Sequence, residues 1–218
     1  MSENDALAAR WRALHAEVSG HGAVLLAVSK YHSDEDVTAL AALGQRNFGE
    51  SRPQALRDRA QKFPELNWHM IGPVQKNKAR YVGRFAAMWH SLSDIAVAEA
   101  VAKYVEGREL PVLLQVNISG ERQKQGVAPE EAAELLAAVK AIPQLKVIGL
   151  MGMAAKANGD DDNAVRASFR MLRDLRESLA DASLRELCMG MSGDFRIAIE
   201  EGATMVRLGT VLFGSEHG

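Results

Sequence analysis

The sequence contains a single cysteine, Cys188, among its 218 residues. One cysteine cannot form an intramolecular disulfide, and it cannot build a cysteine-based metal site. The six histidines show no spacing typical of metal ligands, so we expect no metal site. These absences exclude the disulfide-stapled secreted domains and the common zinc modules.

Long hydrophobic runs are also absent. No apolar stretch approaches the roughly 20 residues that span a bilayer. The first residues, Met1–Ala6, are acidic and lack the apolar core of a secretory signal. We therefore expect a cytoplasmic protein with no membrane association.

The sequence has no excess of positive or of negative side chains. Lysine and arginine total 26 and aspartate and glutamate total 28, which gives a formal net charge of −2 without a basic block. This balance gives no support to a nucleic-acid or membrane-surface partner. Apolar residues make up 47% and charged residues 25%, as in ordinary globular proteins. We expect one domain over residues 1–218, and a monomer.

What the sequence does contain is a regular alternation of apolar runs and helical patterns. The expected strands cover residues 23–30, 47–50, 68–72, 85–91, 111–117, 145–151, 184–189 and 204–208. Short continuous apolar runs are typical of strands covered on both faces, as in parallel sheets. Eight such units predict a closed (β/α)8 barrel of the TIM type, and a doubly wound open sheet is the alternative. The apolar spacing in residues 4–18 predicts an extra N-terminal helix.

Lys30 directly follows the first apolar run. Barrels and open α/β sheets keep their chemistry at this end of a strand. A lysine that is partly desolvated there has a lowered pKa, which suits Schiff-base formation with an aldehyde. The alternative is a strand-end lysine that simply reaches solvent.

Two glycine-containing turns follow the seventh and eighth expected strands. Ser192 is expected to open a helix, where backbone N–H groups are unpaired, and Gly209 with Thr210 forms the second turn. Taken singly, Ser192 reads as an ordinary helix cap and Gly209 as a tight turn. Together, at neighbouring strand ends of a barrel, they predict a phosphate site.

Several motifs, in order along the chain, resemble one known family. They are Ala27–Lys30, Asn47–Glu50, Trp68–Lys78, Gln115–Ser119, Gly149–Met151, Met189–Ser192, Val206–Thr210 and Phe213–Gly214. The chain resembles the pyridoxal phosphate homeostasis proteins, which are single-barrel relatives of the alanine racemase N-terminal domain. The resemblance covers nearly the whole chain.

The resemblance implies pyridoxal 5′-phosphate (PLP) bound as a covalent aldimine on Lys30. It implies that Ser192 and the Gly209-Thr210 turn hold the phosphate and that Arg207 faces the pyridine nitrogen. It also implies that Asn47 and His69 line the mouth beside the ring. Lys124 aligns with a further lysine near the mouth, where the aldehyde would dock transiently.

The sequence departs from the family at Ser51, where asparagine is usual, and at Cys188, where serine is usual. The stretch Gly152–Ala155 replaces one that often contains proline. These changes leave Lys30, Arg207 and the phosphate turns intact.

The expected role is storage of PLP and its delivery to apo-enzymes, without catalysis. A cation at Arg207 opposes protonation of the ring nitrogen, which weakens the electron-sink chemistry of PLP. The second base of racemases lies on a separate domain that we do not expect after Gly218, and Tyr31 is the nearest tyrosine to Lys30. Two alternatives stay open, namely a racemase-like enzyme and a barrel that binds a sugar phosphate with Lys30 as an aldolase-type lysine.

Overall fold

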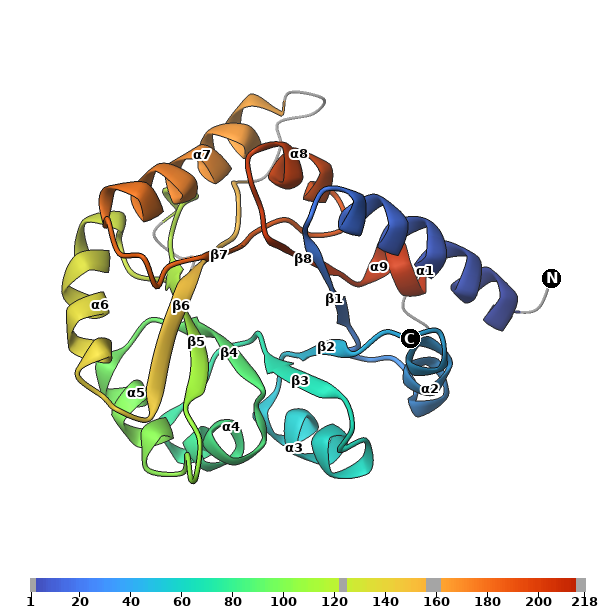
Figure 1. Cartoon of the computed structure of the whole chain (residues 1–218), viewed down its shortest axis with the longest axis horizontal. Helices are drawn as coiled ribbons and strands as arrows, with labels where there is room; N and C mark the ends of the chain where they lie inside the picture. The colour runs from blue at the N-terminus through green and yellow to red at the C-terminus, as the bar shows by residue number, and fades with distance from the viewer. Residues whose placement is uncertain (1–2, 122–124, 156–161, 215–218) are drawn as a thin grey trace.

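The computed structural model describes residues 3–121, 125–155 and 162–214. Its strands pair in parallel, in sequence order, and the first pairs with the last to close a barrel (Figure 1). The strands are β1 (Val24–Val28), β2 (Asn47–Glu50), β3 (Asn67–Met70), β4 (Met88–Leu92), β5 (Leu110–Val116), β6 (Leu145–Gly152), β7 (Glu186–Cys188) and β8 (Met205–Leu208). The predicted (β/α)8 barrel is confirmed, and the open-sheet alternative is wrong because β1 pairs with β8.

Helices surround the ring of strands (Figure 1). They are α1 (Glu3–Gly20), α2 (Asp34–Ala42), α3 (Pro53–Lys62), α4 (Ala79–Phe85), α5 (Ile95–Ala102), α6 (Ala132–Lys140), α7 (Asn163–Ser178), α8 (Phe195–Glu200) and α9 (Thr210–Phe213), with short 3-10 turns η1 (Lys76–Lys78) and η2 (Pro129–Glu131). The capping box that Ser33 and Asp36 form at the start of α2 agrees with the sequence pattern. Among the described residues, none of the helices combines the length and the hydrophobicity that a membrane span requires.

The N-terminal helix α1 completes the outer ring. The helix that follows β8 is only four residues long, and α1 packs against it and against β1. Arg10 joins the two helices, because its Nε donates to the Leu212 carbonyl at 2.7 Å and its Nη2 to the Phe213 carbonyl at 2.9 Å. Helix α1 therefore covers the part of the barrel that a longer final helix would cover.

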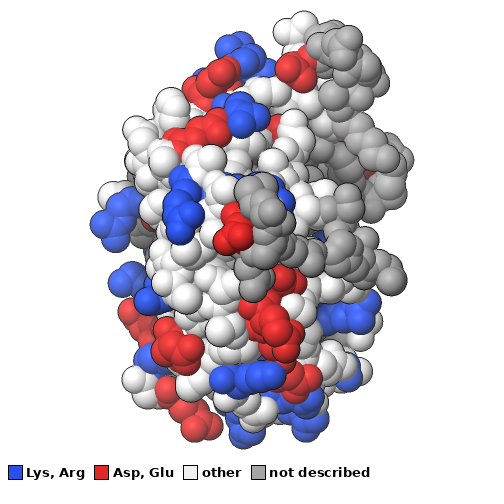
Figure 2. All heavy atoms as spheres, turned by 90° about the vertical axis from the view of Figure 1, so that its right-hand side faces the viewer, with Lys and Arg blue, Asp and Glu red and all other residues white. Residues whose placement is uncertain are grey.

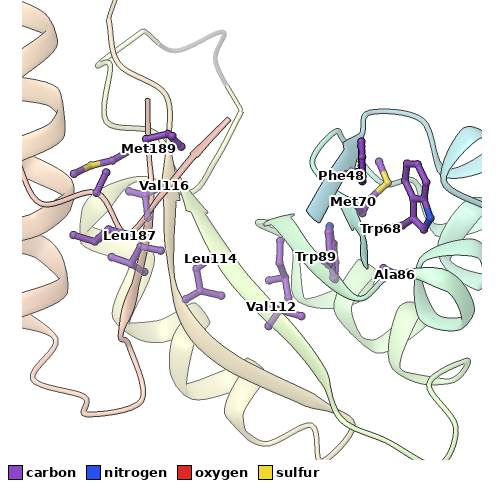
Figure 3. Packing of buried hydrophobic residues seen from close by; sticks show 14 of the residues in the cluster. Phe48, Trp68, Met70, Ala86, Trp89, Val112, Leu114, Val116, Leu187 and Met189 are labelled. Carbon is purple, nitrogen blue, oxygen red and sulfur yellow. The ribbon is translucent and has the colours of Figure 1, made fainter. Parts of the chain in front are cut away.

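The core has two layers, because successive side chains of a strand point to opposite faces. The outer layer lies between strands and helices and includes the large buried side chains Phe48, Trp68 and Trp89 (Figure 3). A separate inner cluster is formed by Leu26, Leu113, Met151, Cys188 and Met205. The barrel interior is thus filled with side chains, and a ligand can enter only at its ends.

The surface charges are mixed. On the face in Figure 2, lysines and arginines alternate with aspartates and glutamates, with no field of a single sign. The described residues contain no group of three histidine, cysteine or acidic side chains placed to hold a metal ion.

Candidate functional site

A cavity of about 340 Å³ opens at the carboxyl ends of the strands. This volume lies within the range of small-molecule sites, ~300–1,000 Å³. The cavity is lined by Val28, Lys30, Ser51, Ile71, Met191, Ser192, Gly193, Arg207, Gly209 and Thr210. Five of the residues predicted from sequence, namely Lys30, Ser192, Arg207, Gly209 and Thr210, thus meet at one site.

Lys30 lies in a tight turn just after β1. The turn is closed by the His32 N–H, which donates to the Ser29 carbonyl at 3.0 Å. Lys30 is exposed at the cavity rim, so the partial desolvation expected from its position after a buried strand is not observed. Its side chain is free to reach into the cavity.

Tyr31 has an unusual backbone conformation for its residue type. Its φ is 68°, in the left-handed region that side chains with a Cβ rarely adopt. The Lys30 Nζ lies 5.6 Å from the centre of the Tyr31 ring, and the Arg52 guanidinium lies 5.3 Å from it. Tyr31 is therefore held beside Lys30 at the rim and is 60% exposed.

The two predicted phosphate turns are joined through Ser192. Its Oγ accepts hydrogen bonds from the N–H groups of Gly209 and Val211, both at 3.3 Å. The loop before α8 is closed by the Met191 N–H, which donates to Asp194 Oδ1 at 2.6 Å. Ser192 does not open the helix as predicted, because Asp194 is the residue before the first turn of α8. It lies in the preceding loop and faces the cavity.

Arg207 is the charged side chain inside the barrel at the base of the cavity. It is 5% exposed, and its Nε and Nη2 have no hydrogen-bond partner in the part of the chain that the structure describes. Burying unpaired donors of a charged group is costly. An acceptor supplied by a ligand would remove this cost, and the nitrogen of a pyridine ring is such an acceptor. The site therefore fits PLP at the position predicted for Arg207.

His69 lies deeper than predicted. It is 4% exposed and does not line the cavity, whereas Ile71, two residues further along the same face, does. Its Nδ1 lies 2.8 Å from His90 Nε2, and His90 Nδ1 lies 3.3 Å from Cys188 Sγ. The prediction that His69 borders the ring is wrong, because the imidazole contacts His90 in a buried row of side chains below the cavity.

The buried histidines are neutral at pH 7. Burial lowers the pKa of His69 to about 4, and burial, together with the proximity of His69 and of the Arg207 cation, holds the pKa of His90 well below its usual value. Burial also raises the pKa of the Cys188 thiol to about 11. These three side chains, His69, His90 and Cys188, are therefore uncharged beside the Arg207 cation.

The neutral histidines make a testable contribution to acid sensitivity. In the unfolded chain His69 takes up a proton near pH 6.5, whereas in the folded protein it does so only near pH 4. As the pH falls through this window the unfolded state binds more protons, so His69 alone should lower the free energy of unfolding by about 3 kcal/mol at pH 4. Urea unfolding between pH 7 and 4 should show a shallower pH dependence for His69→Asn than for the parent. Parallel pH dependences would contradict the assignment.

Asn47 is at the wrong end of the barrel for its predicted role. It is the first residue of β2, whereas the cavity lies beyond the last residue of that strand. Its Oδ1 accepts a hydrogen bond of 3.0 Å from Asn67 Nδ2, at the start of the neighbouring strand. The prediction that Asn47 lines the mouth is therefore wrong in location, because Asn47 begins β2 and Glu50 ends it.

Five lining residues were not predicted as part of the site: Val28, Ser51, Ile71, Met191 and Gly193. Side-chain alternation gives a signal for Val28 and Ile71, which lie two residues from Lys30 and His69 respectively. The backbone of Ser51 packs directly against Gly72. A Cβ at position 72 would lie 2.1 Å from the Ser51 carbonyl oxygen. Only glycine allows the chain segments after β2 and β3 to approach this closely.

Two other features stand apart from this cavity. Lys124 lies outside the described residues, so its role as a second docking point stays a prediction. A larger hollow of about 630 Å³ lies between α7 and Pro129 of η2, lined by residues such as Arg170 and Met171. No lysine lines it and no strand ends there, so we do not assign the site to it.

The fold and the cavity define a class, the (β/α)8 barrels with a ligand site at the carboxyl face. Residues 3–217 match the family model described as "Alanine racemase, N-terminal domain". Curated relatives with high coverage share the description "Pyridoxal phosphate homeostasis protein". The chain belongs to the pyridoxal phosphate homeostasis protein family, whose barrel is the alanine racemase N-terminal domain.

The similarity to individual members is extensive. The relative from Aquifex aeolicus is 39% identical over 208 residues, covering 91% of this chain and 90% of its own. The relative from Pseudomonas aeruginosa is 40% identical over 195 residues, covering 88% and 84%. A solved structure of PipY from Synechococcus elongatus with PLP bound is 31% identical, covers 95% of this chain and 100% of its own, and has a TM-score of 0.83.

Proposed function

We propose that this protein binds PLP through a Schiff base to Lys30, stores it in protected form and releases it to PLP-dependent enzymes. One observation carries the proposal: an amine, two linked glycine turns and a buried guanidinium line the same cavity, and two nitrogens of that guanidinium have no hydrogen-bond partner among the described residues. The homeostasis proteins to which the chain is similar, and PipY with its bound PLP, support it.

Each part of the cavity suits one part of the cofactor. Ser192, Gly193, Gly209 and Thr210 supply small side chains and turn backbone for a phosphate. Arg207 donates toward the ring nitrogen. Lys30 supplies the amine that condenses with the aldehyde, with loss of water.

The same residues favour storage over catalysis. When bound, PLP can act as an electron sink if its ring nitrogen is protonated, and the Arg207 cation opposes that protonation. Racemisation also needs a second acid or base beside the lysine. Among the described lining residues, only Lys30 and Arg207 have ionisable side chains, and a guanidinium does not act as a base at neutral pH.

We further propose an intracellular monomer that exchanges PLP with apo-enzymes. The large exposed hydrophobic residues among those described, Val24, Tyr31, Met171 and Met191, belong to different elements. Singly exposed apolar residues are normal and do not mark an obligate interface. A lone buried Cys188 suits a reducing compartment.

A transfer assay tests the role. PLP-loaded protein is mixed with an apo-aminotransferase while a phosphatase destroys free PLP, and free PLP serves as the control. We expect reactivation to survive the phosphatase only when PLP is supplied on the protein. We also expect racemisation of L-alanine no faster than with free PLP. Faster racemisation would make the protein an enzyme, and failure to take up PLP would overturn the proposal.

A further inference from the structure

Residues on the helix-facing side of the strands contact the turn that carries Lys30. Ser29, the residue before Lys30, is completely buried. Its Oγ donates to Glu50 Oε1 at 2.8 Å, and its N–H donates to the Gly49 carbonyl at 3.2 Å. The cavity wall on one side of Lys30 is thus fixed to the end of β2.

Glu50 connects this contact to a second one. It is 3% exposed, and the Nε of Arg59 lies 3.8 Å from the same carboxylate oxygen that accepts from Ser29. Arg59 also donates to the His32 carbonyl and pairs with Asp34. One guanidinium from α3 therefore contacts groups on both sides of the Lys30 turn.

The turn needs such support because it contains an unfavourable conformation. Tyr31, between Lys30 and His32, has a φ of 68°. A non-glycine residue in this region is unfavourable and persists only where surrounding contacts enforce it. The contacts of Ser29 and His32 with Glu50 and Arg59 flank the strained residue directly.

We propose that Glu50 and Arg59 are positioning residues for Lys30, which hold its turn in the conformation that directs the amine to the cavity before any ligand enters. The inference rests on the proposed function, since it assumes that Lys30 forms the Schiff base. In that step the Lys30 Nζ attacks the aldehyde carbon, a C=N bond forms and water leaves, so no oxidant or reductant is involved. Neither Glu50 nor Arg59 lines the cavity.

The test compares Glu50→Ala, Glu50→Gln and Arg59→Met with the parent, starting from apo-protein mixed with PLP. Two quantities are measured: total bound PLP by equilibrium dialysis, and the rate at which the yellow imine band appears. Small misplacements of a reacting group reduce rates by up to about 100-fold. We expect Glu50→Ala to slow imine formation about tenfold while phosphate-directed docking is retained. Glu50→Gln should show a smaller effect, because its side-chain oxygen can still accept from Ser29.

Hydrogen exchange of the apo-protein gives a readout that does not depend on PLP. The Ser29 and His32 amides should exchange faster in Glu50→Ala and Arg59→Met than in the parent. This change would show that the turn itself has loosened.

Glu201→Gln is a matched control for lost stability. Glu201 is also a buried carboxylate, 4% exposed, and accepts from Arg166, Arg170 and Arg173 near the start of β8. Its replacement should lower the free energy of unfolding and leave the imine rate and the exchange of the Lys30 turn unchanged.

The outcomes separate this inference from the proposed function. If the parent forms no imine at Lys30, the proposed function fails. If the parent forms it and Glu50→Ala and Arg59→Met form it at the parental rate, the positioning role is overturned and the storage role stands. An equal slowing in Glu201→Gln would also overturn it, because general destabilisation would then explain the effect.

Discussion

Replacement of Lys30 by alanine should abolish the yellow imine band of the PLP-loaded protein. Lys30 is the only lysine among the described residues that line the cavity, so no other lining side chain can supply the amine. PLP should still dock through the phosphate turns and Arg207. Loss of the covalent link should weaken its retention on the order of 100-fold, because the bound aldehyde no longer has an amine held beside it.

The measurement is an absorption spectrum after gel filtration, with dialysis for the affinity. Lys146→Ala is the control, because Lys146 lies near the start of β6, at the opposite end of the barrel from the cavity. It should keep both the band and the affinity. An unchanged band in Lys30→Ala would show that another lysine carries the cofactor.

Replacement of Arg207 by methionine should change stability and binding in opposite directions. Methionine has a similar length and needs no hydrogen-bond partner, whereas the Arg207 guanidinium is buried and two of its nitrogens have no partner among the described residues. Removing a buried, unpaired charge should raise the free energy of unfolding of the apo-protein by about 1–3 kcal/mol. The affinity for PLP should fall about 10- to 100-fold, the usual worth of a hydrogen bond to a charged group.

Urea unfolding of the apo-protein and equilibrium dialysis with PLP measure the two effects. Arg108→Met is a contrasting control, because the Arg108 Nη2 is satisfied by the carbonyls of Gly83 and Ala86, at 3.0 and 2.8 Å. It should lose stability and keep its PLP affinity. A less stable Arg207→Met protein with parental affinity would contradict the assignment of Arg207 to the ligand.

The sequence was sufficient to predict eight alternating strand and helix units and half of the cavity lining. Buried parallel strands are visible as apolar runs such as 23–30, and the carboxyl ends of such strands meet on one face. Lys30, Ser192 and Gly209 follow their strands and Arg207 is the residue before the last of β8, so their meeting could be predicted from order alone. The closing pair between β1 and β8 could not, because an open sheet has the same alternation.

The main errors concerned how far along a strand a residue lies, and therefore how close it is to the cavity. Asn47 and His69 both lie on short strands, where a shift of two or three residues moves a side chain from the mouth to the far end or into the core. The apolar pattern does not show which residue of a four-residue strand is last. Glu50 was not predicted either. Its proposed positioning role depends on a contact with Arg59 in α3, and the local sequence around Glu50 does not indicate that contact.

The most direct test of the central claim is to locate the lysine that carries the cofactor. The PLP-loaded protein is reduced with borohydride, digested, and analysed by peptide mass spectrometry for the pyridoxyl group. We predict the modification on Lys30, in the peptide that contains Ser29 and Tyr31. Modification of a different lysine, or none in a protein that has bound PLP, would contradict the account.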